Sequence, residues 1–97
     1  LGDYAENCIS KFGKYLLHDG KSPKTVASYT GDVIGFLVYL AGMQENFQGE
    51  MKRFQITAFR NSLLEKAFEP VTINKKINSL QSFNRFLIEQ GIMSDFV

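Results

Sequence analysis

Basic and hydroxyl side chains gather at two places in this chain of 97 residues. The candidates are Lys21, Lys24, Thr25 and Ser28 in the first group, and Thr72, Asn74, Lys75, Lys76 and Ser79 in the second. Ammonium and hydroxyl groups donate to phosphate oxygens, and an asparagine amide can pair with the major-groove edge of adenine. These residue types therefore indicate recognition of a polyanion, with double-stranded DNA as the leading candidate.

Each group opens a segment, and the two segments match at a spacing of 47 residues. The matched pairs are Pro23 with Pro70, Thr25 with Thr72, Val26 with Ile73, Val33 with Leu80, Phe36 with Phe83, Tyr39 with Phe86, and Leu40 with Leu87. A proline is favoured at the first position of a helix, and the free N–H groups at a helix start attract anions. The repeat therefore predicts two equivalent helix starts directed at the same kind of ligand.

Apolar residues recur at steps of three and four along four stretches, which predicts helices over 3–18, 23–41, 51–67 and 70–90. Ser22 is a good N-cap, and Gly20, Gly42 and Gly91 are suitable helix stops. Gly31 and Gly35 either let a neighbour approach closely or simply weaken their helix. The third helix lacks a clear cap, and its expected inward residues are Ile56, Phe59, Leu63 and Phe68.

Residues 43–49 are expected to form a polar loop, and residues 92–97 the beginning of a linker. No alternating pattern predicts a strand. The expected architecture is therefore all-α, with one compact four-helix domain over 1–91 arranged orthogonally or as a bundle.

The net charge of +1 does not favour or exclude nucleic acid, but its distribution is uneven. Five of the eleven basic residues fall in two windows, 20–31 and 70–88, that contain no acid. Segregation of this kind suits a one-sided electrostatic surface.

Catalytic, metal and cofactor chemistry has little support in the residues. Cys8 is the only cysteine and occupies an apolar helical position, and the single histidine, His18, suits a helix C-terminus. The tyrosines Tyr4, Tyr15, Tyr29 and Tyr39 lie on or beside apolar stripes and are expected to pack in or around the core. No uninterrupted apolar run approaches the roughly 20 residues of a membrane span, and no secretory signal is visible. We expect no cofactor and no membrane partner.

Two segments resemble the core-binding, SAM-like domain of the tyrosine recombinases, the phage-integrase family. Residues 22–37 (SPKTVASYTGDVIGFL) are similar to the segment that opens that domain, and residues 72–87 (TINKKINSLQSFNRFL) are similar to its last helix. The order of the segments also fits, and the resemblance covers nearly the whole chain. An arginine often precedes the tyrosine of the first segment in this family, whereas Ala27 and Ser28 stand there in this chain.

The resemblance implies a four-helix domain that sits on one face of a recombination site, while a separate C-terminal catalytic domain closes on the other face. The family's catalytic residues belong to that second domain, so this chain is expected to bind and position DNA without cutting it. The implied DNA contacts are Lys24, Thr25, Ser28, Thr72, Lys75, Lys76 and Ser79, with Lys21 just before them. Other recombinase subunits are possible further partners. The resemblance also implies a monomeric isolated domain from a bacterial or phage-encoded protein that acts on DNA in the cytoplasm.

Three other interpretations stay open from the residues. The basic and hydroxyl residues could be ordinary solvated helix positions, with the chain acting as a SAM-like protein-interaction module. A helix-turn-helix repressor is a second possibility, although a last helix of twenty residues with a full core stripe is an awkward recognition helix. A small enzyme is the third, and it lacks a catalytic constellation.

Overall fold

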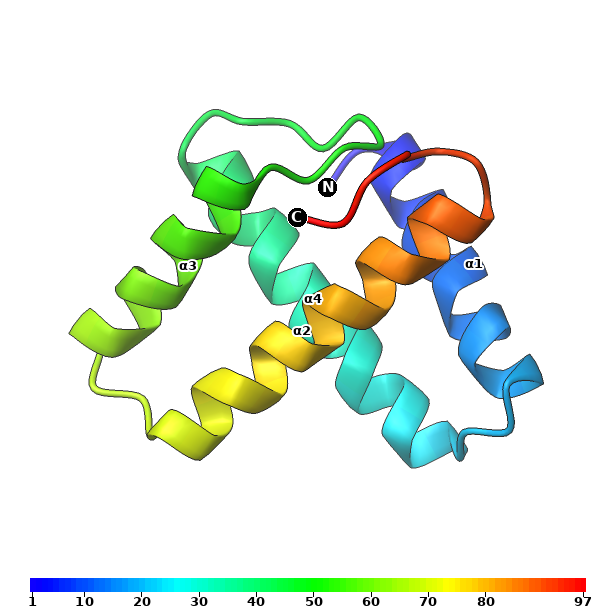
Figure 1. Cartoon of the computed structure of the whole chain (residues 1–97), viewed down its shortest axis with the longest axis horizontal. Helices are drawn as coiled ribbons and strands as arrows, with labels where there is room; N and C mark the ends of the chain where they lie inside the picture. Colours follow the sequence, from blue (N-terminus) through cyan, green and yellow to red (C-terminus); the bar gives the residue numbers. More distant parts are fainter.

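The computed structural model describes all 97 residues as four α-helices joined by three connections, with no strand. Helix α1 spans Asp3–His18, α2 spans Pro23–Gly42, α3 spans Arg53–Glu65 and α4 spans Pro70–Glu89. Helices α2 and α4 cross near their midpoints, with α1 and α3 on either side (Figure 1). The expected all-α, four-helix architecture is confirmed.

The helix ends follow from local chemistry. The Ser22 hydroxyl accepts the N–H of Thr25 at 3.2 Å, so Ser22 is the predicted N-cap of α2, with Pro23 in the first turn. Helices α1 and α4 are each followed, one residue after the cap, by a glycine with positive φ, Gly20 and Gly91.

Helix α3 is shorter than the predicted 51–67. It begins at Arg53 because the side chain of Gln55 accepts the N–H of Lys52 at 2.9 Å, which fixes the helix start there. The helix ends at Glu65, and Ala67 has a left-handed φ of 62°. The chain has therefore left the helix before Phe68, and the prediction that Phe68 points inward is wrong: its side chain is exposed and packs against the ammonium group of Lys76.

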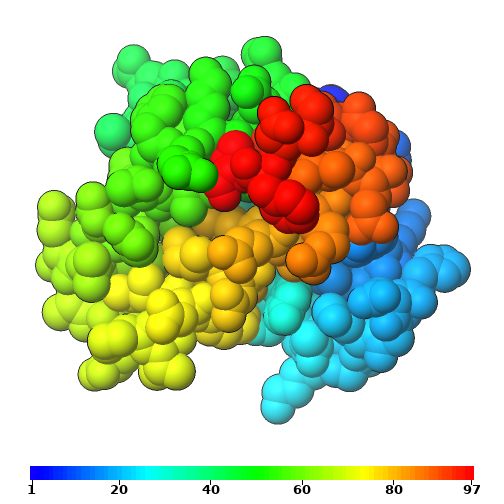
Figure 2. Space-filling view, in the orientation of Figure 1, coloured from blue at the N-terminus to red at the C-terminus, as the bar shows by residue number.

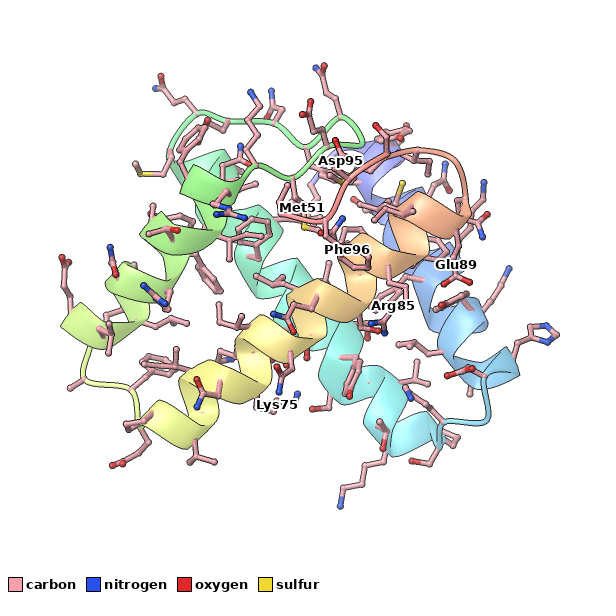
Figure 3. The ribbon with its side chains drawn as sticks, viewed as in Figure 1. Met51, Lys75, Arg85, Glu89, Asp95 and Phe96 are labelled. Carbon is pink, nitrogen blue, oxygen red and sulfur yellow. The ribbon has the colours of Figure 1, made fainter.

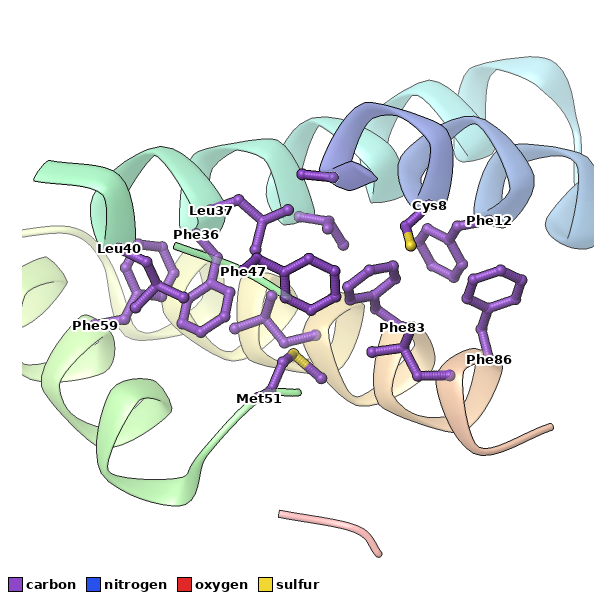
Figure 4. Close-up of a cluster of buried hydrophobic side chains, with 14 of the residues drawn as sticks. Cys8, Phe12, Phe36, Leu37, Leu40, Phe47, Met51, Phe59, Phe83 and Phe86 are labelled. Atoms are coloured by element: carbon purple, nitrogen blue, oxygen red, sulfur yellow. The ribbon is translucent and has the colours of Figure 1, made fainter. Parts of the chain in front are cut away.

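Aromatic rings fill the middle of the core. Phe83 of α4 contacts Phe12 of α1 edge-on, with ring centroids 5.1 Å apart, and also packs against Phe47 and Phe86 (Figure 4). Ring pairs at these separations add to the free energy of apolar burial. Cys8 is buried beside them, as its position predicted.

The loop between α2 and α3 contributes to this core more than its polar composition suggests. Phe47 and Met51 are both buried, so residues 43–52 cross the end of the molecule as a packed connection. The backbone N–H of Met51 also lies 3.5 Å from the sulfur of Met93, which joins the loop to the C-terminal residues.

Residues 92–97 fold back onto α4 and this loop (Figure 1). The organiser is Asn84, which is almost completely buried. Its side-chain oxygen accepts the N–H of Val97 at 2.9 Å, and its amide nitrogen lies 3.3 Å from the carbonyl oxygen of Asp95. Whether these residues lead into a linker stays a prediction.

Helix α2 is long and apolar enough, by length and a mean hydropathy of 1.2, to cross a membrane, which the search for an uninterrupted apolar run did not indicate. Core helices of soluble proteins pass the same test. Here Val33, Phe36 and Leu40 face the core, and Asp32 near the middle of the helix is bonded to two lysines. Part of the apolar composition of α2 thus serves packing within the domain, while Ile34 and Val38 of the same helix are exposed.

Gly35 and Gly49 provide a matched pair of stability predictions. A Cβ at Gly35 would meet nothing within 4 Å, so this glycine does not permit a close approach and only weakens α2. A Cβ at Gly49 would lie 2.8 Å from the Tyr4 hydroxyl, at a φ of +106°. We expect Gly35→Ala to raise the free energy of unfolding by about 1 kcal/mol, and Gly49→Ala to lower it. Urea denaturation would measure both, and a destabilised Gly35→Ala variant would contradict the assignment.

Candidate nucleic-acid interface

The predicted site is built where α2 and α4 cross, and residues matched by the sequence repeat meet there. The Lys75 ammonium donates to the hydroxyl of Ser28, and the Ser79 hydroxyl donates to a carboxylate oxygen of Asp32 at 2.6 Å. Both pairs are 47 residues apart, which is the spacing of the repeat. Equivalent positions of two equivalent helices therefore form the crossing, and the two helix starts diverge from it on the same side of the molecule (Figure 1).

Asp32 is the centre of the crossing. Its side chain is 9% exposed, and its two oxygens lie 2.5 Å from the Lys75 ammonium and 3.3 Å from the Lys76 ammonium, respectively. With the bond from Ser79, the carboxylate has three donors from α4. A buried charge is strongly unfavourable unless it is paired and hydrogen-bonded, and this one is both.

These contacts also set the protonation of the carboxylate. Burial alone would raise the pKa of Asp32, but hydrogen bonds from Lys75 and Ser79 and the charges of both lysines outweigh it. The pKa of Asp32 consequently lies below its ordinary value, so the carboxylate is ionised at neutral pH.

An aromatic ring also lies against each of the two lysines. The Lys75 nitrogen lies 5.5 Å from the centre of the Tyr29 ring, and the Lys76 nitrogen lies 5.8 Å from the centre of the Phe68 ring. The Lys75 side chain is 43% exposed and that of Lys76 is 27% exposed. Lys75 lies just below the crossing in Figure 3, and the space-filling view has a notch between the starts of α2 and α4 (Figure 2). Both ammonium groups are therefore positioned by the fold and still reach solvent.

The two helix starts bear no acidic residue in their first turns. In α2, Lys24 is exposed, and Thr25 is engaged with Ser22, whose hydroxyl donates to the Thr25 hydroxyl at 3.0 Å. In α4, Pro70 follows Glu69, and no side chain caps the helix. The first turn of α4 thus leaves backbone N–H groups and a partial positive charge facing outward.

The structure brings most of the predicted site residues to this surface. Lys24, Ser28, Thr72 and Asn74 are exposed, and Thr25, Lys75 and Lys76 are half-buried. Lys21 is also half-buried, because its ammonium group pairs with Asp19 at 3.6 Å and lies 5.9 Å from the centre of the Tyr29 ring. We call this set, without Ser79, the basic face.

Ser79 differs from the other predicted residues. Its side chain is fully buried, and its hydroxyl is bonded to Asp32, so it does not present a donor to solvent. Sequence reasoning grouped Ser79 with the exposed donors because serine is a common phosphate ligand. In the folded domain its role is to hold the carboxylate that positions the lysines.

Asp32 itself was not predicted to belong to the site, because it lies one residue beyond the acid-free window 20–31. One signal could have found it: Asp32 and Ser79 are a matched pair of the repeat, one turn beyond Ser28 and Lys75. A row of exposed side chains also runs along α4, and of its members only Asn74 was predicted to contact DNA. Its members, at steps of three and four, are Val71, Asn74, Asn78, Gln81 and Arg85.

Surface hollows occur elsewhere on the molecule, and none is lined by residues of the basic face. No group of three or more potential metal-binding side chains is present either. The arrangement suits contact with an extended anionic ligand through a surface of donors.

The lowered pKa of Asp32 predicts a specific pH dependence of stability. A carboxyl group whose pKa is lower in the folded state adds stability above its unfolded pKa of about 3.8, and this stability is lost as the pH falls through the folded value. We expect Asp32→Asn to be less stable than the unmodified domain at pH 6, and the difference to shrink below about pH 4. Urea denaturation at several pH values would measure this, and a difference independent of pH would contradict it.

Comparison with known proteins assigns this chain to a family. Residues 9–91 match the family model described as the phage integrase, N-terminal SAM-like domain. No solved structure matches the chain significantly.

Curated relatives agree with the family match. The chain is 35% identical over 79 residues to tyrosine recombinase XerC of Chlorobaculum parvum, covering 75% of this chain and 24% of that protein. It is 31% identical over 88 residues to the TnP I resolvase of Bacillus thuringiensis, covering 90% of this chain and 31% of that protein. Tyrosine recombinase XerD of Oceanobacillus iheyensis is 29% identical over 92 residues, with coverages of 93% and 31%. The matched part of the chain therefore spans only 24% to 31% of the length of these relatives. The match over nearly all of its helical core shows that this chain belongs to the N-terminal SAM-like domain family of the phage integrases and tyrosine recombinases.

Proposed function

We propose that this domain binds double-stranded DNA through the basic face and positions it for strand exchange by a separate C-terminal catalytic domain. The observation that carries the proposal is the crossing at Asp32, which directs two basic, hydroxyl-bearing helix starts to one side of the molecule. The family match supports the same role, because its relatives are named recombinases and a resolvase.

Phosphate contacts are the main source of affinity in this proposal. Lys21 and Lys24 lie at the start of α2, while Lys75 and Lys76 lie in the second turn of α4, beside Asp32. Each phosphate that is neutralised steepens the dependence of log K on log salt by about 0.9, so about four contacts give modest binding that fades with salt. The hydroxyl groups of Ser28 and Thr72 add donors that orient the duplex.

Base recognition is assigned to the exposed row along α4. Asn74, Asn78 and Gln81 carry amides, which pair with adenine in the major groove, and Val71 offers an apolar contact for a thymine methyl group. From Val71 to Gln81 the helix rises by about 15 Å, comparable to four or five base pairs. A row of this length can read a short sequence without bending of the helix.

Strand cleavage is assigned to the part of the recombinase outside this domain. The tyrosines of this chain are engaged in packing: Tyr15 donates to Glu89, and Tyr29 lies against Lys75. The activity of the whole protein then requires the catalytic domain and further recombinase subunits on bacterial or phage DNA in the cytoplasm.

A protein-interaction module is the second candidate function, and one observation favours it. Leu1 and Ile9 of the α1 region and Ile34 and Val38 of α2 line a shallow hollow of about 510 Å³, in which Leu1, Ile34 and Val38 are exposed. This surface is mostly apolar, although Glu6 and Ser10 also line it, and it is distinct from the basic face. In a recombinase it would suit contact with another protein.

The two candidates predict different responses to DNA. An NMR titration of the ¹⁵N-labelled domain with a 20-base-pair duplex would follow every backbone amide at 50 and 200 mM NaCl. We expect shifts confined to residues 21–29 and 71–82 that weaken at the higher salt concentration, because phosphate contacts release counterions. Absence of shifts at 50 mM would reject DNA binding by the isolated domain and favour the interaction module.

Substitutions of Lys24 and Asn74 test phosphate contact and base recognition separately. We expect Lys24→Gln to weaken binding to all duplexes and to reduce the salt slope by about 0.9, because it removes one phosphate contact. Asn74→Ala is expected to leave the slope unchanged and to weaken binding only to duplexes with adenine at one position, by about 1–3 kcal/mol.

The control for the charge removed in Lys24→Gln is Lys52→Gln. Lys52 is exposed at the start of α3, away from the basic face, and the substitution removes the same charge as Lys24→Gln. Fluorescence anisotropy over a salt series would measure all three variants. An equal loss of slope in Lys52→Gln would mean that overall charge, and not the basic face, controls binding.

A further inference from the structure

An acid at the centre of the basic face acts against the attraction of phosphate and therefore requires an explanation. Asp32, Lys75 and Lys76 carry two positive charges and one negative charge, so the cluster retains +1. Burial of a paired charge is often no better for stability than an apolar side chain of similar volume. Apolar side chains already hold α2 against α4, and the carboxylate adds a fixed register to that packing.

The geometry allows Lys75 and Lys76 to keep their hydrogen bonds within the domain while they also donate to a phosphate. An ammonium group has three donors. Lys75 uses one on Ser28 and one on Asp32, and Lys76 uses one on Asp32. One donor on Lys75 and two on Lys76 stay available on side chains that reach solvent.

The contacts also reduce the conformational freedom of the two lysines. A free lysine side chain loses rotamer entropy when a ligand fixes it. Here Asp32 with Tyr29 holds Lys75, and Asp32 with Phe68 holds Lys76, before any ligand is bound. The cluster therefore combines fixed donors with a reduced charge.

We propose that Asp32 is a specificity-determining residue of the DNA surface: it fixes the donors of Lys75 and Lys76 while cancelling one of their two charges. Its effect is to lower the sequence-independent attraction to any duplex without removing the directed contacts. Fixed donors fit phosphates in one arrangement only, whereas freed lysines can follow the phosphates of any duplex. Asp32 therefore weakens non-specific binding more than specific binding, and this widens the difference between the two affinities. This inference rests on the proposed DNA-binding function.

The test uses Asp32→Asn and the anisotropy of labelled random-sequence 20-base-pair duplexes between 50 and 300 mM NaCl. The variant frees a full second charge on the face. We expect its log–log salt slope to be steeper by about 0.9, and its binding at 50 mM to be roughly three- to tenfold tighter. Across a panel of duplexes of different sequence, its affinities should spread over a narrower range than those of the unmodified domain.

Two variants act as controls for charge. Glu6→Gln makes the same change in net charge at an exposed position in the first turn of α1, and it should leave the slope unchanged. The double variant Asp32→Asn/Lys76→Gln returns the cluster to a charge of +1, and its slope should return to that of the unmodified domain. A role for Asp32 in stability alone would not produce this reversal.

The outcomes distinguish failure of the proposed role of Asp32 from failure of the proposed DNA binding. If the unmodified domain does not bind the duplexes, the proposed function fails. If it binds and Asp32→Asn has the same slope and the same spread of affinities, the role of Asp32 is overturned while DNA binding stands. Circular dichroism would check folding, with Asp32→Ser as a second neutral variant. Unfolding of both variants would also overturn the inference, because the carboxylate would then be a requirement of the fold.

Discussion

The contact between α2 and α4 at Asp32 is the constraint on which the rest of this domain depends. It sets where the two longest helices cross, and it fixes the directions of their starts. The crossing is polar, whereas the remainder of the interface is built from Phe36, Leu40, Phe83 and their neighbours. Apolar packing tolerates sliding and exchange of similar side chains more readily than a carboxylate with three donors does. The polar contact therefore specifies one register for two helices that the aromatic core holds together.

The core and the DNA-facing surface proposed above come from different sides of the same helices. In α4, one side supplies Leu80, Phe83 and Leu87 to the core, while the opposite side has the exposed row from Val71 to Arg85. The polar crossing occupies the boundary between them. This division lets the exposed residues vary with little effect on packing, which is the arrangement expected when a common scaffold serves different target sequences.

Much of this organisation could be predicted from the sequence because it depends on local or periodic signals. The four helices, the Ser22 cap, the buried Cys8 and the core stripes all follow from spacing along the chain. The features that the sequence did not predict depend mostly on contacts between residues far apart in the chain. Asn84 looks like a surface residue until the chain folds back to give it Val97 and Asp95 as partners. Ser79 was assigned to the surface because only the tertiary structure places Asp32 opposite it. Phe68 was misplaced because the left-handed φ of Ala67 is not signalled by a glycine.

The matched pairs at the crossing have a geometric consequence. Ser28 contacts Lys75 and Asp32 contacts Ser79, and the two residues of each pair lie equally far along their helices from Pro23 and Pro70. A half-turn about an axis through the crossing therefore exchanges α2 with α4 approximately, although their sequences differ. A DNA duplex has half-turn axes of its own, which exchange its two antiparallel strands. Placed on such an axis, the domain would present one helix start to each strand at equivalent phosphates, and only the differences between the helices, such as Asn74 against Ala27, would reveal the direction of the sequence.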